Sequence, residues 1–234
     1  QYAYMYKAYA FDELKQYEEA IRCLDASLDI DDKFARAMHI RGYILDNMER
    51  YDEALICFDK ALEIDPTYVR SLNSKGVTLR IIERYDESLI CYDKALEIDP
   101  KYKSPLRNKA IALKNMERYD EALICFDKAL EIDPTYVGSL NSKGVTLRIM
   151  ERYDEALICF DKALEIDPTY VRSLNSKGVT LRIIERYDES LICYDKALEI
   201  DPKYKSPLRN KAIALKNMER YDEALICFDK ALEI

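Results

Sequence analysis

The sequence contains no tryptophan, one histidine, five glycines and seven prolines among its 234 residues. The lone histidine, His39, has no serine or cysteine in a recognisable triad context, which argues against hydrolase chemistry. Glycine-rich loops that cradle phosphate groups are absent. No apolar run approaches the roughly 20 residues that span a bilayer, and the first residues do not resemble a signal peptide. These absences favour a soluble protein that is not an enzyme and uses no cofactor.

The seven cysteines recur once every 34 residues, with no Cys-x-x-Cys pair and no nearby histidine to form a zinc site. Packed helices lie roughly 8–10 Å apart, whereas the Cα atoms of a disulfide lie within about 7 Å. We therefore expect buried, reduced thiols and a reducing cytoplasm as the compartment. The column consists of Cys23, Cys57, Cys91, Cys125, Cys159, Cys193 and Cys227.

The chain is acidic, with 36 Lys and Arg against 44 Asp and Glu and a net charge of −8. A surplus of acids argues against a general affinity for nucleic acid or anionic membrane, although a local basic surface is still compatible with it.

A Glu-Arg-Tyr-Asp-Glu motif recurs every 34 residues from Glu49 to Glu219. This period divides residues 1–234 into one array without linkers, whose last repeat is incomplete and has no capping helix. Because the chain starts without Met and stops inside a repeat, we expect it to be a segment of a longer protein. The repeats are 1–34, 35–68, 69–102, 103–136, 137–170, 171–204 and 205–234.

A second period of 102 residues is superimposed on the first, since Glu49–Ile132 and Glu151–Ile234 are identical. Such identity indicates recent tandem duplication or deliberate construction.

Each repeat predicts two helices. Small or apolar residues of Val69–Ile82 share one face at the helical period, and those of Tyr85–Ile98 do the same. Only Glu83 and Arg84 separate the two segments, so the helices must be antiparallel neighbours joined by a tight turn. Asp99-Pro100 then ends the second helix.

The repeat resembles the tetratricopeptide repeat over the whole chain. In residues 137–170 the family pattern is matched by Leu140, Lys143, Gly144, Leu147, Ala156, Phe160, Ala163 and Pro168. The resemblance implies an all-α, right-handed superhelical solenoid of antiparallel helix pairs. It also implies that the first helices line a concave groove, which in this family commonly holds an extended peptide or a partner helix.

Small residues at Gly76, Gly144 and Gly178 are expected to let helix backbones approach closely. The sequence departs from the family pattern where Lys replaces a leucine in five repeats. We expect these lysines to lay their methylenes over the packed face and to place their ammonium groups in water. They are Lys75, Lys109, Lys143, Lys177 and Lys211.

Charge divides unequally between the two helices of a repeat. Residues 69–82 carry three basic residues and no acid, whereas residues 83–100 carry six acids and two basic residues. The recurring acids of the second helix are best read as a solvated face. Basic, polar and apolar columns of the first helices are therefore predicted to form a peptide-binding groove. Its candidate residues are Arg70, Asn73, Val77, Arg80, Arg107, Ile111, Lys114, Asn141, Val145, Arg148, Arg172, Asn175, Val179, Arg182, Arg209 and Lys216.

Our functional hypothesis is a protein interaction scaffold that binds an extended, acidic peptide or protein segment. Asn side chains would meet the ligand's backbone, and Arg and Lys would meet its carboxylates. A family clamp for a terminal carboxylate is not carried over, because Val77, Ile111, Val145 and Val179 occupy the position where its Asn is needed. The competing interpretation is that the basic helices merely balance the acidic ones.

Two other functions stay open. A structural, self-assembling solenoid could form through the uncapped ends, or through a column of surface isoleucines on the second helices. Binding of single-stranded RNA is less favoured, because Val and Ile stack poorly on bases. The isoleucines are Ile56, Ile90, Ile124, Ile158, Ile192 and Ile226.

Overall fold

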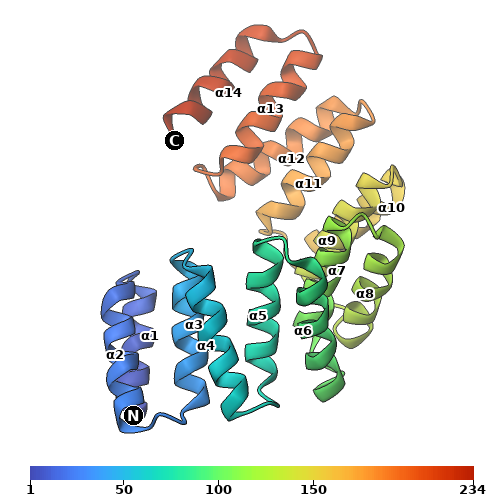
Figure 1. The fold of residues 1–234 in the computed structure, drawn as a ribbon. Coiled ribbons are helices and arrows are strands. Elements are labelled where there is room, and N and C mark those ends of the chain that lie inside the picture. The colour runs from blue at the N-terminus through green and yellow to red at the C-terminus, as the bar shows by residue number, and fades with distance from the viewer. The chain divides into compact units, whose positions relative to one another are not determined.

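The computed structural model describes residues 1–234 as fourteen α-helices without a strand (Figure 1). The all-α prediction is therefore confirmed. The helices fall into two compact units, Gln1–Met116 (unit 1) and Glu117–Ile234 (unit 2). Unit 1 contains α1 (Tyr2–Glu13), α2 (Tyr17–Ile30), α3 (Ala35–Asn47), α4 (Tyr51–Ile64), α5 (Val69–Ile81), α6 (Tyr85–Ile98) and α7 (Lys103–Asn115). Unit 2 contains α8 (Tyr119–Ile132), α9 (Val137–Ile149), α10 (Tyr153–Ile166), α11 (Val171–Ile183), α12 (Tyr187–Ile200), α13 (Lys205–Asn217) and α14 (Tyr221–Glu233).

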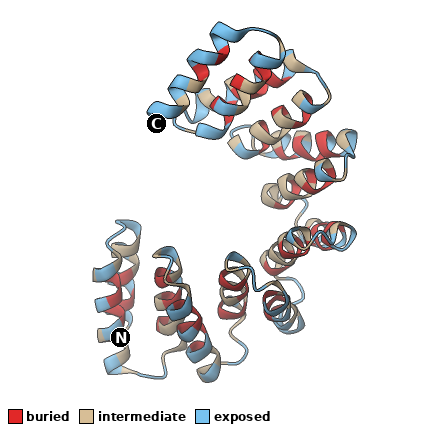
Figure 2. Ribbon diagram, turned by 45° about the horizontal axis from the view of Figure 1, so that its top comes forward, coloured by how far each residue is buried: buried red, intermediate tan, exposed pale blue.

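Within each unit, consecutive helices pack as antiparallel pairs, and each pair packs on the next. In unit 2 the tightest neighbours are α9 with α10, α11 with α12, and α13 with α14. The first helix α11 also contacts α9 and α13 directly, and in unit 1 α5 contacts α3 and α7 in the same way. Buried residues line the inner surfaces of the helices, and exposed residues cover the outside (Figure 2).

The turn between the two helices of a pair contains a residue in the left-handed backbone region. In the fifth repeat this residue is Glu151, with φ of 60°. Its N–H donates to the Arg148 carbonyl at 3.1 Å, and the next N–H, of Arg152, donates to the Leu147 carbonyl at 2.9 Å. This is the Schellman ending of a helix, which usually places glycine at that position. Equivalent residues are Lys15, Glu49, Glu83, Glu117, Glu185 and Glu219.

Replacing the turn residue with glycine should stabilise unit 2. Glu151→Gly removes the steric cost of a Cβ at positive φ, and we expect a net gain of about 0.5–1 kcal/mol after the entropy of glycine is subtracted. Urea unfolding followed by circular dichroism measures it. Glu155→Gly, inside the first turn of α10, is the control and should destabilise. A lower midpoint for Glu151→Gly would contradict the prediction.

Four repeats carry a glycine sixteen residues before an aromatic residue, and the two are in direct contact. A Cβ at Gly144 would lie 2.6 Å from Cε1 of Phe160, on the partner helix of the same pair. Gly76 and Gly178 make the same contact with the rings of Tyr92 and Tyr194. Each glycine makes room for an aromatic ring of its own repeat, and a Cβ at Gly42 would also lie 3.1 Å from the backbone oxygen of Ala54, in line with the predicted close approach of the helices.

The lysine column links neighbouring repeats. Lys177 of α11 forms an ion pair with Asp161 of α10, which belongs to the preceding repeat, at 2.5 Å. The expectation that these ammonium groups lie free in water was wrong, because an aspartate sixteen residues earlier accepts each of them. Since the partners are partly exposed, each pair contributes less than about 1 kcal/mol. The other pairs are Lys75 with Asp59, Lys109 with Asp93, Lys143 with Asp127, and Lys211 with Asp195.

All seven cysteines are free and buried, as predicted. Burial raises the pKa of the Cys91, Cys159 and Cys193 thiols. The thiols are therefore poorly reactive small apolar groups that fill the space between helices.

Candidate functional site

Within each unit, the first helices of neighbouring repeats place their side chains at equivalent positions of a common face. We call this surface the first-helix face of each unit: α3, α5 and α7 in unit 1, and α9, α11 and α13 in unit 2. Contact between these consecutive helices brings the predicted site residues of neighbouring repeats together within each unit.

Three cations follow one another along the first-helix face of unit 2, and we call Arg148, Arg182 and Lys216 the cation column. Arg148 and Arg182 are half-buried, and Lys216 is exposed. The Nε atoms of both arginines are inaccessible to water and have no hydrogen-bond partner. Desolvation, followed by the nearby charge of Arg182, lowers the pKa of Arg148. The column therefore contains two poorly solvated arginines without a counter-ion, followed by one exposed lysine.

Unit 1 is different at the same positions. Asp12 and Asp46 stand on α1 and α3 where later repeats carry a cation, and Arg80 and Lys114 follow on α5 and α7. Thr78 donates its hydroxyl to Asp46 Oδ1 at 2.6 Å. Burial raises the pKa of Asp46, while Thr78 and the charge of Arg80 act in the opposite direction. The basic column predicted from Arg80 onward thus begins next to the carboxylate of Asp46, at the equivalent position of the preceding repeat.

The asparagines of the predicted groove are already engaged between repeats. Asn175 Oδ1 accepts a hydrogen bond from Asn210 at 2.9 Å, and Asn141 Oδ1 accepts one from the Ser173 hydroxyl at 3.3 Å. Asn73 Oδ1 likewise accepts a hydrogen bond from the side-chain amide of Asn108 at 3.0 Å. Their amide N–H groups are consequently the part that a ligand could still use.

The remaining predicted residues flank the cation column and the asparagines. The branched apolar side chains Val77, Ile111, Val145 and Val179 are half-buried and form an apolar strip. Arg107 is half-buried with its Nε inaccessible. The last three arginines, Arg70, Arg172 and Arg209, are exposed.

His39 is packed among aromatic side chains. Its ring centroid lies 5.2 Å from that of Tyr68 and 5.8 Å from that of Phe58, and Nδ1 lies 3.2 Å from the Ser71 hydroxyl. Burial, together with the charges of Arg70 and Arg36, lowers the pKa of His39 to about 4. The imidazole is therefore neutral at physiological pH, and no carboxylate orients it as in a triad.

The stability of unit 1 should fall as pH decreases from about 6.5 towards 4. In the unfolded chain a histidine titrates near 6.5, whereas His39 in the fold titrates near 4, so protons bind the unfolded state first. The loss has a slope of at most about 1.4 kcal/mol per pH unit. Thermal melts across this range measure it. His39→Asn, which introduces the residue found at Asn73, should flatten the dependence; an unchanged profile would contradict the prediction.

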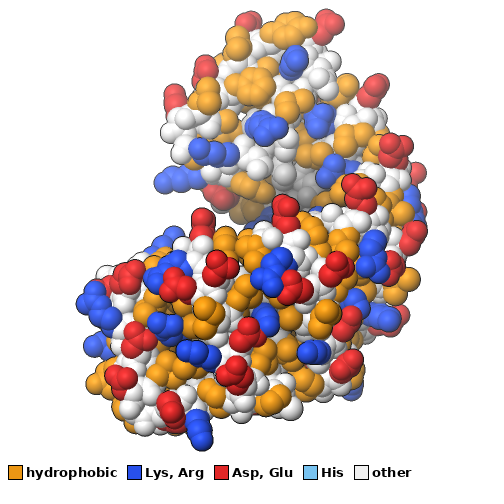
Figure 3. Space-filling view, in the orientation of Figure 1, with side chains coloured by type: hydrophobic (Ala, Val, Ile, Leu, Met, Phe, Trp, Pro, Cys, Tyr) orange, Lys and Arg blue, Asp and Glu red, His pale blue; other side chains and the backbone are white.

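The second helices show a different surface, on which charges are paired. Arg186 donates both Nε and Nη2 to the carboxylate of Glu189, each at 2.6 Å, and the same bidentate pair recurs in the other repeats from Arg50 onward. Charged side chains of both signs are interspersed with apolar ones in the space-filling view (Figure 3).

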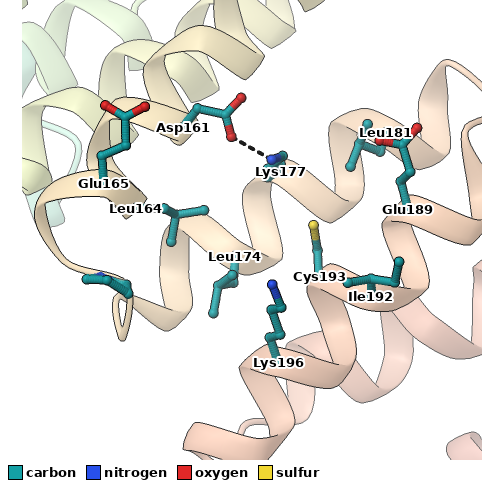
Figure 4. Close-up of a pocket in the computed structure, with 11 residues that line it drawn as sticks. Asp161, Leu164, Glu165, Leu174, Lys177, Leu181, Glu189, Ile192, Cys193 and Lys196 are labelled. Atoms are coloured by element: carbon teal, nitrogen blue, oxygen red, sulfur yellow. Dashed lines mark hydrogen bonds and ion pairs between the residues drawn. The ribbon is translucent and has the colours of Figure 1, made fainter.

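Clefts lie between consecutive second helices. One of about 480 Å³ is lined by α10, α11 and α12, with Leu174, Leu181 and Cys193 as apolar lining and the Lys177–Asp161 pair beside it (Figure 4). Ile192, which is 55% exposed, lies on its rim. The isoleucine column is exposed throughout, at 54–55%, as the sequence predicted.

Two buried tyrosines that lie beneath the first-helix face were not among the predicted site residues. Tyr92 and Tyr194 are fully buried, and no hydrogen-bond partner engages their hydroxyl groups. Burial raises the pKa of each to about 12, while Arg80 and Arg182 respectively act in the opposite direction. The sequence does show this difference, because these two repeats carry tyrosine where Phe58, Phe126, Phe160 and Phe228 stand in four others and Leu24 stands in the first.

Nowhere in the chain do three or more His, Cys, Asp or Glu side chains gather in a way that could hold a metal ion. A membrane-crossing helix would need a longer or more apolar stretch than any of the helices provides.

Stacked helix hairpins with a row of exposed first helices define a repeat scaffold. Models of the tetratricopeptide repeat match residues 2–34, 35–68, 69–102, 105–136, 135–203 and 193–226. The chain belongs to the tetratricopeptide repeat family. Proteins of this family are generally non-enzymatic scaffolds for protein interactions.

Solved structures show the same fold at low sequence identity. A tetratricopeptide repeat protein from Parabacteroides merdae ATCC 43184 is 16% identical with a TM-score of 0.79, covering 99% of this chain and 91% of that one. PilW, a type IV pilus biogenesis factor, is 20% identical with a TM-score of 0.77, covering 86% and 93%. YrrB, described as having an unusual peptide-binding site, is 24% identical with a TM-score of 0.56, covering 80% and 97%. No functionally curated protein matches the chain.

Proposed function

We propose that the chain is a protein interaction scaffold that binds an extended, acidic protein segment on its first-helix face. The observation that carries the proposal is the cation column of unit 2, whose arginines have buried Nε atoms without partners. Arginines of the helix turns, such as Arg186, are satisfied by a glutamate three residues later. The Nε atoms of Arg148 and Arg182 lack such a partner, and we expect these two cations to pair with an acidic ligand.

The spacing of the helices sets the spacing of acids in the ligand. Neighbouring helices lie roughly 8–10 Å apart and an extended chain advances about 3.3 Å per residue, so one repeat corresponds to about three ligand residues. A segment with an acid at every third position would meet Arg148, Arg182 and Lys216 in succession.

Polar and apolar columns supply the remaining contacts. Because the Oδ1 atoms of Asn141 and Asn175 are engaged, their amide N–H groups would donate to ligand backbone carbonyls. The half-buried Val145 and Val179 would accept small apolar side chains from the ligand. Peptide binding is also the property named for YrrB, and we extend it to this chain as part of the proposal.

Fluorescence anisotropy tests this function. The probe is a labelled peptide with glutamate at every third position, and the control is a peptide of the same composition in scrambled order. We expect the periodic peptide to bind more tightly, with an affinity that falls as salt rises. Equal binding of both peptides, or none at low salt, would refute the proposal.

Self-association is the second candidate, favoured by the isoleucine column, whose members are 54–55% exposed. Light scattering over a range of concentrations tests this idea, with Ile158→Gln and Ile192→Gln as surface variants. A monomer at every concentration would exclude it for this chain.

RNA binding is the least favoured function. The net charge is −8, and the first-helix face presents valine and isoleucine where base stacking needs aromatic rings.

Free, buried thiols are consistent with work in a reducing compartment such as the cytoplasm.

A further inference from the structure

The second helices carry a stripe in which an aspartate, an isoleucine and a lysine follow one another at intervals of four residues. On α12 the stripe is Asp188, Ile192 and Lys196, and all three side chains are exposed. Residues four apart lie on the same side of a helix, so the three form one line along its surface. The same stripe begins on α4, α6, α8, α10 and α14 at Asp52, Asp86, Asp120, Asp154 and Asp222.

The two charges of the stripe are not used within the chain. Neither Asp188 nor Lys196 takes part in an ion pair, whereas Glu189 of the same helix is bound by Arg186, and Asp195 by a lysine of the next repeat. Eight residues of helix separate Asp188 from Lys196 by about 12 Å, so they cannot neutralise one another. The stripe therefore presents a free carboxylate, an apolar side chain and a free ammonium group in that order.

A cleft runs beside the stripe. Ile192 and Lys196 both line the cleft between α10 and α12, and Leu174 and Leu181 of α11 lie at its apolar base, 5% and 1% exposed (Figure 4). In unit 1 the isoleucine and the lysine of the α4 stripe likewise line a cleft, of about 290 Å³. Each second helix is thus a ridge with an apolar groove next to it.

The stripe is complementary to a copy of itself that runs in the opposite direction. The aspartate lies about 6 Å before the isoleucine along the helix axis, and the lysine lies about 6 Å after it. When two stripes run antiparallel with their isoleucines level, each aspartate faces a lysine. When they run parallel, like charges face one another, which is unfavourable.

The first repeat lacks the stripe. Its second helix, α2, carries Glu18, Arg22 and Ala26 at the equivalent positions. Arg22 is exposed and pairs with Glu19 of its own helix at 3.4 Å. A second helix can therefore form and pack in this fold with a cation in place of the isoleucine.

We propose that the second-helix face docks in antiparallel orientation on the same face of a second copy of the chain. This inference rests on self-association, the second candidate function, and specifies which faces meet and in which direction. Ile192, which is 55% exposed, enters the partner's cleft, Asp188 pairs with the partner's Lys196, and Lys196 pairs with the partner's Asp188. A twofold arrangement of this kind uses one patch twice and closes as a dimer.

Sedimentation velocity over a range of concentrations measures the association. The test variant changes the isoleucine of all six stripes to arginine, the residue that α2 carries at Arg22. We expect the wild-type chain to dimerise and the variant to be a monomer with unchanged helical circular dichroism. The six added charges change the net charge from −8 to −2, so general repulsion between copies falls. Ile149→Arg with Ile183→Arg, at exposed positions of first helices, is the control and should leave the dimer intact.

An exchange of charges tests the direction of docking. Asp188→Lys with Lys196→Asp, made together in every stripe from α4 to α14, keeps the net charge at −8. In the antiparallel arrangement this exchanged chain complements itself, but it sets like charges against the wild-type chain. We therefore expect each chain to form dimers alone, and energy transfer between differently labelled chains to show at least tenfold fewer mixed dimers than random pairing gives.

The outcomes separate this inference from self-association in general. A dimer that forms equally well with the six arginines overturns the docking surface and leaves self-association standing. Mixed dimers at the random frequency, or in excess of it, overturn the antiparallel pairing. A wild-type chain that is monomeric at every concentration overturns both. Because the stripes lie outside the first-helix face, binding of the periodic acidic peptide should be the same in the arginine variant and the wild-type chain.

Discussion

Reversing two charges of the cation column, with Arg148→Glu and Arg182→Glu together, abolishes binding of the periodic acidic peptide. Each reversal removes an attraction and adds a repulsion at a half-buried position, where solvent screens charge poorly. Close charge pairs in interfaces contribute about 1.5 kcal/mol or more each, so affinity should fall by at least about 100-fold at low salt. Anisotropy with the labelled peptide measures the loss.

The matched control places the same charge change on the second helices. Lys162→Glu and Lys196→Glu together alter exposed residues of α10 and α12 and shift the net charge equally. Peptide affinity should change less than about threefold, because exposed charges are screened. Equal losses in both double variants would mean that net charge alone governs binding, and the first-helix site would then be abandoned.

Removing the aromatic ring beneath the first helix should have the largest effect on stability. Phe160 is 0% exposed and packs with Leu123, Leu147 and Ala156, and its ring fills the space left by Gly144. Phe160→Ala leaves a cavity there and should cost about 3–5 kcal/mol. Because repeat arrays open locally, hydrogen exchange of α9 and α10 should report the loss most directly.

The residues equivalent to Phe160 in two other repeats provide the controls. Phe228→Ala in α14 should cost less, since Phe228 is only partly buried. Tyr194→Phe should be close to neutral in stability, because it removes a buried hydroxyl group that has no partner. If Phe160→Ala unfolds no more easily than Phe228→Ala, the ring does not hold the pair together as described.

Local sequence signals predicted the helices closely. The predicted second helix Tyr85–Ile98 has the bounds of α6, and the predicted first helix ends one residue beyond the end of α5 at Ile81. The apolar period and the Asp-Pro helix endings depend on residues that are close together in the chain, so both can be recognised in a single sequence. The left-handed turn residue escaped notice because glutamate is unusual at positive φ.

Contacts between repeats were harder to predict. Lys177 was expected to end in water, but the helix packing places Asp161 within reach of it. The periodic pattern lists such residues but does not say which of them meet. Aligning all repeats by column would have drawn attention to Tyr194 and to Asp46, since each departs from its column.

The difference between Asp46 and its equivalent Arg148 belongs to a difference of one whole helix. Outside one helix and its turn, residues 35–132 and 137–234 are the same, and α9 differs from α3 at most positions. The same following hairpins therefore stand beside two different first helices, the diverged α3 and an α9 that matches α5 at all but one position. Replacing one first helix can therefore change the ligand preference of such a scaffold while the packing of the neighbouring hairpins is kept.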